Sequence, residues 1–98
     1  MFDRVLGRMR KLVRDSAYVL TVHGQDAMED DNLTIFDVER CLLSGSIIER
    51  QRDRRTREWK YLVRGETTEG EEMVTVAKIG RRGRLVIVTV YLVGGEAC

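Results

Sequence analysis

Three side chains in this sequence are of types that can act together on a phosphate group, namely His23, Arg64 and Tyr91. A histidine suits acid or base work because its ordinary pKa, about 6.5, lies near neutrality. An arginine suits the stabilisation of negative charge that builds on a phosphate. A tyrosine can donate a proton or orient a phosphate, although an ordinary pKa of about 10 makes it a poor unaided base.

Each of these residues also has an ordinary structural explanation. His23 is the only histidine and follows the apolar run "YVLTV", where it could instead cap a helix or join it to a strand by a hydrogen bond. Tyr91 could be an aromatic side chain buried in a strand. Arg64 could be a solvated surface charge, but its place within an otherwise apolar strand favours contact with a phosphate.

Basic residues gather in the stretches 4–14, 50–60 and 78–84, although the net charge of the chain is only +1. Arginine outnumbers lysine by 14 to 3. Guanidinium groups match phosphate geometry, but codon usage in a GC-rich genome explains the excess equally well. The run "RQRDRRTREWK" surrounds an expected hairpin turn, so it is either a solvated loop or a surface that attracts nucleic acid. The candidate phosphate-binding residues are Arg50, Arg52, Arg54, Arg55 and Lys60.

Four carboxylates follow the histidine closely: Asp26, Glu29, Asp30 and Asp31. Their spacing does not match the calcium loop of an EF-hand, which has ordered ligands around a central glycine. The chain also lacks a phosphate-cradling glycine loop, a nucleophile elbow and a dinucleotide-binding fingerprint. We therefore expect neither a metal ion nor a cofactor.

The two cysteines, Cys41 and Cys98, lie far apart and have no CxxC or Cys/His cluster around them. This pattern predicts neither a disulfide framework nor a zinc site. The stretch "MFDRVLGRMRKLVRDS" is charged every few residues, unlike a signal peptide. No run approaches the roughly 18 uncharged apolar residues of a membrane helix. We expect a cytoplasmic protein without a membrane partner.

The elements that must position these residues follow from the spacing of the apolar side chains. A chain of 98 residues predicts one domain, 1–98. Apolar residues at helical spacing precede Gly45, and Thr34 with Asp37 resembles a capping box. After Gly45 the pattern is extended, with glycine in the turns. The expected helices cover 2–14, 24–31 and 35–44, and the expected strands cover 17–22, 46–52, 58–66, 72–79 and 84–93.

These elements predict an α+β fold, with N-terminal helices packed on one face of a four-stranded, mainly antiparallel twisted sheet. Strict alternation divides the last strand into one row with Val86, Val88, Val90 and Leu92 and another with Leu85, Ile87, Thr89 and Tyr91. The aliphatic row is expected to meet the helices. Four residues are then expected on the open face: Lys60, Arg64, Thr89 and Tyr91.

Four segments together resemble a family of small bacterial domains of uncharacterised function. They are "YVLTVHGQDAM", "LTIFDVERCLLSGSIIE", "KYLVRGETTEGEEMVTVAKI" and "LVIVTVYL". The family pattern is T-x-H-A-x-x-R-M, then I-S-x-x-D-V-x-x-A-L-x-x-G, Y-L-V-x-G and I-T-V-Y, and the match runs from about Tyr18 to Leu92. The chain departs from this pattern at Ala27 and Asp31, where the family usually has arginine, and at Gly24, where it usually has alanine.

That family is similar to the RelE/ParE toxins. The resemblance implies a RelE-like fold and the toxin role in a type II toxin–antitoxin pair, neutralised by an antitoxin with a helix-turn-helix and a zinc-finger region. It also implies a metal-independent endoribonuclease that cleaves mRNA, either free or on the ribosome. His23, Arg64 and Tyr91 are the expected catalytic residues.

Two other kinds of function stay open. The first is a non-catalytic binding module that uses the basic face for a protein or nucleic-acid partner, which the missing arginines at Ala27 and Asp31 favour. The second is a structural role through an exposed edge of the sheet.

Overall fold

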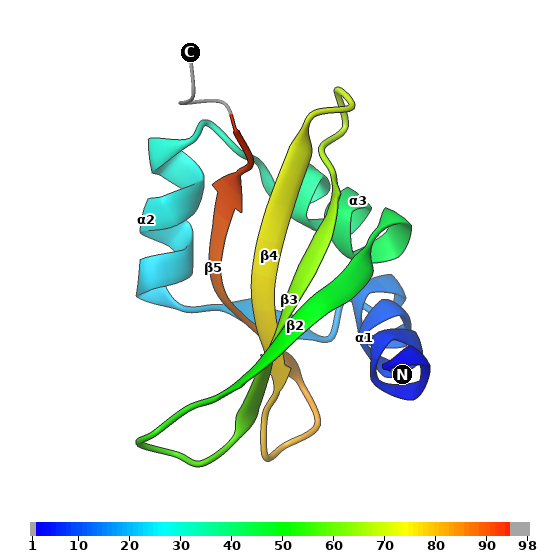
Figure 1. Cartoon of the computed structure of the whole chain (residues 1–98), viewed down its shortest axis with the longest axis vertical. Coiled ribbons are helices and arrows are strands. Elements are labelled where there is room, and N and C mark those ends of the chain that lie inside the picture. The colour runs from blue at the N-terminus through cyan, green and yellow to red at the C-terminus, as the bar shows by residue number, and fades with distance from the viewer. Residues whose placement is uncertain (1, 95–98) are drawn as a thin grey trace.

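The computed structural model describes residues 2–94, which form three helices and one five-stranded sheet (Figure 1). The helices are α1 (Asp3–Arg14), α2 (Val22–Asp30) and α3 (Ile35–Ser44). The strands are β1 (Tyr18–Leu20), β2 (Ser46–Arg52), β3 (Trp59–Glu66), β4 (Glu72–Ile79) and β5 (Leu85–Leu92). The α+β class is thus confirmed. Among the described residues, no helix combines the length and the apolar character needed to cross a membrane.

The sheet has the strand order β1-β5-β4-β3-β2. Strands β2 to β5 form an antiparallel meander, and β1 pairs with β5 in parallel, with Tyr18 opposite Leu85. The expectation of four strands is therefore wrong, since the sheet has five and is mixed. The short run "YVL" becomes a strand because it meets a partner more than 60 residues further along the chain.

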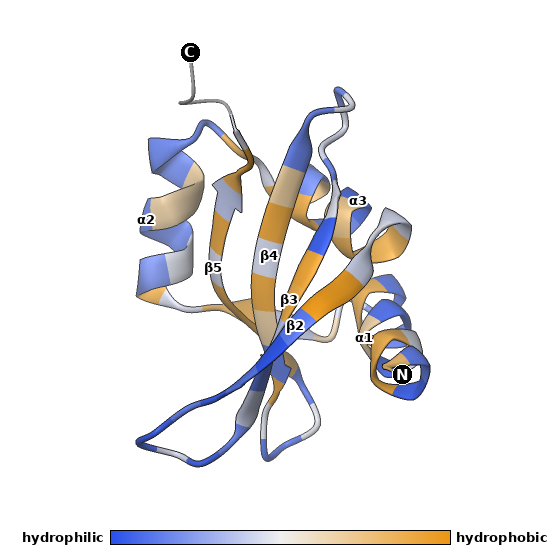
Figure 2. Cartoon of the chain, in the orientation of Figure 1, coloured by the Kyte–Doolittle hydropathy of each residue, from blue (hydrophilic) through white to orange (hydrophobic). Residues whose placement is uncertain are grey.

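Helices α1 and α3 cover one face of the sheet and bury the main core against it (Figure 2). Met9 of α1 and Cys41 of α3 are fully buried, as are Val63 of β3, Met73 of β4 and Ile87 of β5. Burying an aliphatic side chain of this size stabilises a fold by about 1.5–3 kcal/mol. This layer therefore holds the sheet in place and leaves its opposite face without a helix.

The end of α3 lies directly on β3 because two glycines allow it. A Cβ atom at Gly65 would overlap the carbonyl of Cys41, and one at Gly45 would overlap the carbonyl of Arg64. Arg10 of α1 completes the contact, since its guanidinium donates to the carbonyls of Leu42 at 3.2 Å and of Gly45 at 2.6 Å. These bonds satisfy carbonyls that a helix end leaves unpaired. The backbone beside Arg64 is therefore firmly positioned.

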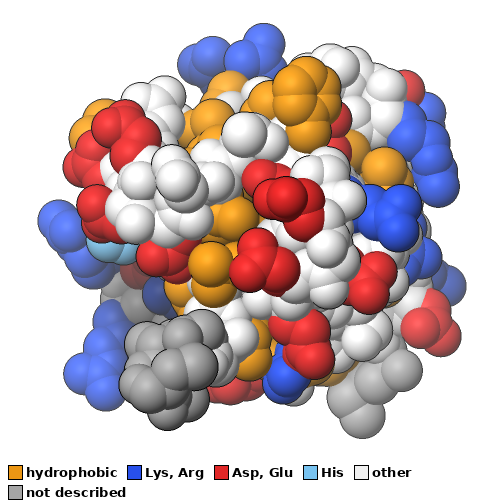
Figure 3. Space-filling model, turned by 90° about the horizontal axis from the view of Figure 1, so that it is seen from above, with side chains coloured by type: hydrophobic (Ala, Val, Ile, Leu, Met, Phe, Trp, Pro, Cys, Tyr) orange, Lys and Arg blue, Asp and Glu red, His pale blue; other side chains and the backbone are white. Residues whose placement is uncertain are grey.

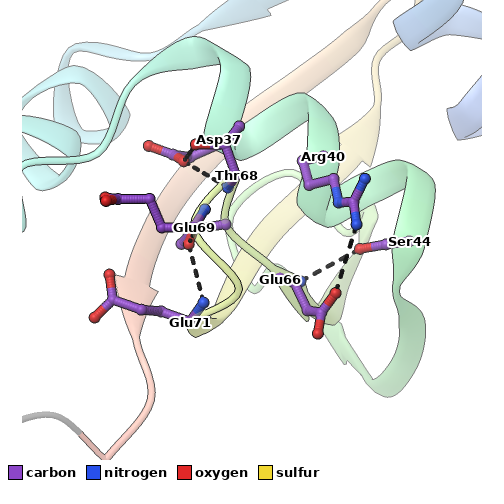
Figure 4. A network of polar contacts seen from close by, with 8 residues as sticks. Asp37, Arg40, Ser44, Glu66, Thr68, Glu69 and Glu71 are labelled. Carbon is purple, nitrogen blue, oxygen red and sulfur yellow. Dashed lines mark hydrogen bonds and ion pairs between the residues drawn. The ribbon is translucent and has the colours of Figure 1, made fainter.

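Asp37 joins the beginning of α3 to the turn between β3 and β4 (Figure 4). Its carboxylate accepts hydrogen bonds from the Thr34 backbone at 2.8 Å and from the Thr68 backbone and hydroxyl at 2.9 and 2.8 Å. The Thr34 hydroxyl accepts in return from the Asp37 backbone, which completes a capping box. One buried carboxylate thus caps a helix and fixes a turn that is distant in sequence.

Helix α2 lies along the edge of β5 that β1 leaves uncovered (Figure 1). The Thr21 hydroxyl accepts a hydrogen bond from Gly24 and donates one to the Val88 carbonyl, both at 2.9 Å. At the other end of α2, the Asp31 carboxylate accepts from the Leu92 backbone at 3.0 Å. The helix therefore occupies hydrogen-bonding groups that an edge strand would otherwise expose.

Bulges in β2 and β5 change which side chains face the helices. In β5, Thr89 is opposite Val76 and Ile87 is opposite Ala77, so Val88 is an inserted residue. The expectation that the Val86 row meets the helices is therefore wrong before the bulge, where Val88 packs on the opposite face, and correct after it, at Val90 and Leu92. Leu85, Ile87 and Val90 belong to the core beneath the helices, whereas Tyr91 is exposed. In β2, Ile48 is inserted in the same way between Ile47 and Glu49.

Candidate functional site

Arg64 and Tyr91 share the sheet face that lies opposite α1 and α3. Arg64 of β3 is opposite Val74 of β4, and Val74 is opposite Tyr91 of β5, so the three form one row across the sheet. Strands lie about 4.8 Å apart, which places the backbones of Arg64 and Tyr91 about 10 Å apart. Both side chains are exposed. The structure therefore brings these two predicted residues together.

A small apolar floor surrounds this row. Leu62, Val74 and Val76 are buried together, with Val88 and Val93 packed against them, and no helical residue belongs to this cluster. Lys60 of β3 and Lys78 of β4 alternate with these apolar residues and lie on the same face. The open face thus combines an apolar floor with basic groups at one end.

The Arg64 guanidinium already has a partner. Its Nε donates to the Glu72 carboxylate at 2.6 Å, and a second nitrogen forms an ion pair with the same oxygen. About half of each side chain is exposed. An exposed pair of this kind is worth only about 0–1 kcal/mol, so an incoming phosphate can replace Glu72 at low cost.

His23 lies in the first turn of α2 and is exposed. The capping role that it could have taken belongs to Thr21, whose hydroxyl accepts from the backbone of Gly24. Among the described residues, no hydrogen bond joins the His23 side chain to another group. Thr21 contacts the Val88 carbonyl, and Tyr91 lies three residues beyond Val88, about 10 Å along the strand. His23 is therefore beside β5, and within residues 2–94 no hydrogen bond or ion pair joins it to Arg64 or Tyr91.

Arg50 and Arg52 lie on the other side of the sheet. The Arg50 guanidinium carbon is 3.9 Å from the centre of the Trp59 ring and 5.7 Å from that of Phe2, the N-cap residue of α1. The Arg52 guanidinium carbon is 4.4 Å from the same Trp59 ring. Such cation–π contacts are worth about 0.5–1 kcal/mol each at exposed sites. Two of the five predicted phosphate-binding residues thus cover an aromatic ring beside α1.

Arg54 and Arg55 lie in the hairpin loop between β2 and β3, and Lys60 lies at the base of this loop. Hydrogen bonds from the backbones of Thr56 and Arg55 lower the pKa of Asp53 at the start of the loop. A shallow hollow of about 350 Å³ is lined by Arg52, Asp53, Arg54 and Arg57. The arginines of the loop therefore surround a carboxylate that the backbone keeps ionised.

The sequence-based prediction missed Glu72, which pairs with Arg64. It noted the basic stretch 78–84 but did not assign Arg81, Arg82 and Arg84, in a second basic loop between β4 and β5, to the site. The position of the second loop beside the first could have been predicted from the sequence. In an antiparallel meander every other turn lies at the same end of the sheet, so the first and third hairpins must lie together. The pairing of Glu72 with Arg64 left no such signal, because it depends on a diagonal contact between strands.

The acidic residues around α2 are not arranged as a metal site. Within residues 2–94, no three histidine, cysteine or carboxylate side chains lie close enough together to hold a metal ion. Asp31, one of the two positions where the resembled family usually has arginine, hydrogen-bonds the backbone of β5. Cys41 is a buried free thiol, whereas Cys98 lies outside the described residues.

Comparison with known proteins shows the family to which this chain belongs. No curated protein and no solved structure is significantly similar to this chain. The family model described as a domain of unknown function (DUF4258) matches residues 20–92. The matched range begins in β1, ends with β5, and includes His23, Arg64 and Tyr91. Because the match covers well over half of the chain, this protein belongs to the DUF4258 family.

Proposed function

We propose that this protein is the toxin of a type II toxin–antitoxin pair, with a RelE-like fold, and that it cleaves mRNA as a metal-independent endoribonuclease. The observation that carries the proposal is the row of Arg64, Val74 and Tyr91 on a face without a helix. An arginine and a tyrosine about 10 Å apart can reach one phosphate from opposite sides. The apolar floor between them can support the substrate.

The chemistry assigns one role to each residue. His23 takes the proton from the RNA 2′-hydroxyl, because a tyrosine is a poor base near neutral pH. The 2′-oxygen attacks phosphorus while the bond to the 5′-oxygen breaks, and Arg64 stabilises the charge that builds on the phosphate oxygens. Tyr91 donates a proton to the leaving 5′-oxygen. The cognate antitoxin, with a helix-turn-helix and a zinc-finger region, would then block the open face.

A second candidate function is a non-catalytic binding module for a protein or nucleic-acid partner. Glu72 pairs with the Arg64 guanidinium, and among the described residues no hydrogen bond or ion pair joins His23 to Arg64 or Tyr91. Ala27 and Asp31 replace the arginines of the resembled pattern, and Asp31 has a structural contact instead. These features favour binding without cleavage.

Growth arrest separates the two functions. Expression of the wild-type protein without its antitoxin should stop growth, and His23→Ala or Arg64→Ala should restore it. Loss of acid–base catalysis lowers a rate by about 10²–10⁴, and loss of a charge-stabilising group by about 10²–10³. Arg40→Ala is the matched control, because Arg40 is an exposed arginine of α3 that also pairs with a carboxylate, Glu66, and has no assigned role in the reaction.

Purified protein supplies the second readout. The toxin should cleave an mRNA in the presence of EDTA, and the gene next to its own should encode a helix-turn-helix protein that binds it. A wild-type protein that is harmless at high level and leaves RNA intact would contradict the toxin role. A stable complex with RNA that is never cleaved would establish the binding module instead.

A further inference from the structure

Two hairpin loops leave the same end of the sheet and lie next to each other (Figure 1). The first joins β2 to β3 and the second joins β4 to β5. Lys78, at the base of the second loop, donates to the Glu58 carboxylate of the first at 2.9 Å. We call residues 52–60 and 78–84 together the basic end. Figure 2 shows that the loops of this end are strongly hydrophilic.

The basic end has a charge unlike that of the rest of the chain. Its two segments hold nine lysines and arginines and two carboxylates, so they carry +7 although the whole chain carries +1. Both carboxylates have partners already, since Asp53 accepts from the loop backbone and Glu58 accepts from Lys78. Within residues 2–94, the seven arginines of the basic end are all exposed and none forms an ion pair, and Arg52 stacks on Trp59. The other six are Arg54, Arg55, Arg57, Arg81, Arg82 and Arg84.

The side chains present indicate which part of a nucleic acid this end can contact. Single strands are bound largely by stacking their bases on aromatic side chains. Trp59 is the one aromatic residue of the basic end, and the guanidinium groups of Arg50 and Arg52 cover its ring. Guanidinium forks bind phosphate oxygens well, and a double helix holds its phosphates in fixed rows on both sides of a groove. Two adjacent loops of arginines suit such rows.

We propose that the basic end anchors the protein to the sugar–phosphate backbone of double-helical RNA, independently of base sequence. The inference rests on the proposed function only in taking RNA as the ligand. The protein would then contact RNA at two places: a single strand on the open face, and a double helix at the basic end. The inference newly assigns four arginines to binding: Arg57, Arg81, Arg82 and Arg84.

The test is a fluorescence anisotropy titration of an RNA duplex of about 16 base pairs at several salt concentrations. One variant changes Arg81, Arg82 and Arg84 to Gln, and another changes Arg54, Arg55 and Arg57 to Gln. The control changes Arg8, Lys11 and Arg14 to Gln, which removes the same charge from exposed positions on α1. Thermal melting by circular dichroism verifies that each variant is folded.

Each hairpin variant should raise the Kd on the order of tenfold and reduce the slope of log K against log salt by about 2–3, while the control should change neither much. An equal loss in all three variants would show that only net charge matters and would overturn the proposal. Equally tight binding of a single strand of the same length, or of duplex DNA, would overturn the assignment to double-helical RNA.

Failure of this inference is distinguishable from failure of the proposed function. If RNA is never cleaved but the hairpin variants bind duplex RNA weakly, the endoribonuclease proposal is wrong and the proposal that the basic end binds duplex RNA is supported. If growth arrest depends on His23 and Arg64 while the hairpin variants bind duplex RNA normally, the proposed RNA contact of the basic end is wrong and the toxin function is supported.

Discussion

At the scale of single residues, Asp37 carries the clearest dependence on pH. Burial alone would raise its pKa, but hydrogen bonds from the backbones and hydroxyls of Thr34 and Thr68 outweigh burial and lower the pKa below its ordinary value of 3.8. A carboxyl whose pKa is lowered by folding stabilises the fold above its unfolded pKa. That contribution is lost as the pH falls from about 4 through the lower folded value.

Asp37→Asn should therefore destabilise the protein at neutral pH and less so in acid. An amide cannot accept on both of its sides, so at least one partly buried hydrogen bond from Thr34 or Thr68 is lost. The expected loss of unfolding free energy at pH 7 is about 1–3 kcal/mol. Urea unfolding at pH 7 and at pH 3 measures it. Asp26→Asn, at an exposed position of α2, is the control, and an equal loss at both pH values for Asp37→Asn would contradict the explanation.

At the scale of elements, α2 approaches β5 closely because Gly24 has no side chain. A Cβ atom there would lie 2.9 Å from the Ile87 carbonyl oxygen and 3.3 Å from that of Val88. Both neighbours are backbone atoms, which cannot move without shifting the strand. The glycine thus sets the distance between His23 and the edge of β5.

Gly24→Ala should lower stability by about 1–3 kcal/mol, because the helix or the strand must move to relieve the contact. Gly7→Ala is the opposite case, since Gly7 is exposed in the middle of α1 with nothing within 4 Å of the added atom. It should raise stability by about 0.5–1 kcal/mol. A change of 1 kcal/mol moves the Tm of a domain this size by about 4–8 °C. Thermal melting can therefore detect both the expected loss of stability and the expected gain. A gain for both variants would refute the close approach at Gly24.

Apolar spacing predicts where the elements are, and the observed bounds differ from the expected ones by two residues at most. The faces of two strands could not be predicted in the same way. Alternation from Ile47 would place Arg50 and Arg52 on the open face with Arg64, but the inserted Ile48 turns them towards α1. Val88 has the same effect in β5. Both bulges lie in runs of similar aliphatic residues, where no side chain marks the insertion.

Only part of the candidate site could be predicted from the sequence. Arg64 and Tyr91 could be placed on one face because each lies on the expected side of its strand. Arg50 and Arg52 could not, because their place depends on the bulge at Ile48. The role of Asp31 was also hidden, since its partner, the backbone of Leu92, is 61 residues away.

At the scale of the whole molecule, charge is divided between the two ends of the long axis. The basic end lies at one of them, and Figure 3 shows acidic side chains gathered on the surface seen from the other. The exposed carboxylates in this part of the fold include Asp26, Glu29 and Asp30 of α2 and Glu69, Glu71 and Glu72 near the turn between β3 and β4. A net charge of +1 therefore conceals two strongly charged surfaces.

A polyanion should stabilise this protein in spite of its small net charge. Heparin at a hundred times its Kd would add about 2.7 kcal/mol if it binds only the folded state, and so raise the Tm by several degrees in low salt. The increase should vanish at about 1 M salt, where screening acts over about 3 Å. It should also be much smaller when Arg81, Arg82 and Arg84 are changed to Gln, and an unchanged increase in that variant would place the binding surface elsewhere.

The order of the strands also limits how copies of this chain can join. Helix α2 and the short strand β1 cover one edge of the sheet. Among the described strands, only β2 therefore presents a long edge without a partner. A protein with one unpaired edge strand can form one symmetric edge-to-edge contact, with the same strand of a second copy. No edge strand is then left for a third copy. Misassembly through the sheet would therefore end at a pair of molecules and would not grow into a fibre.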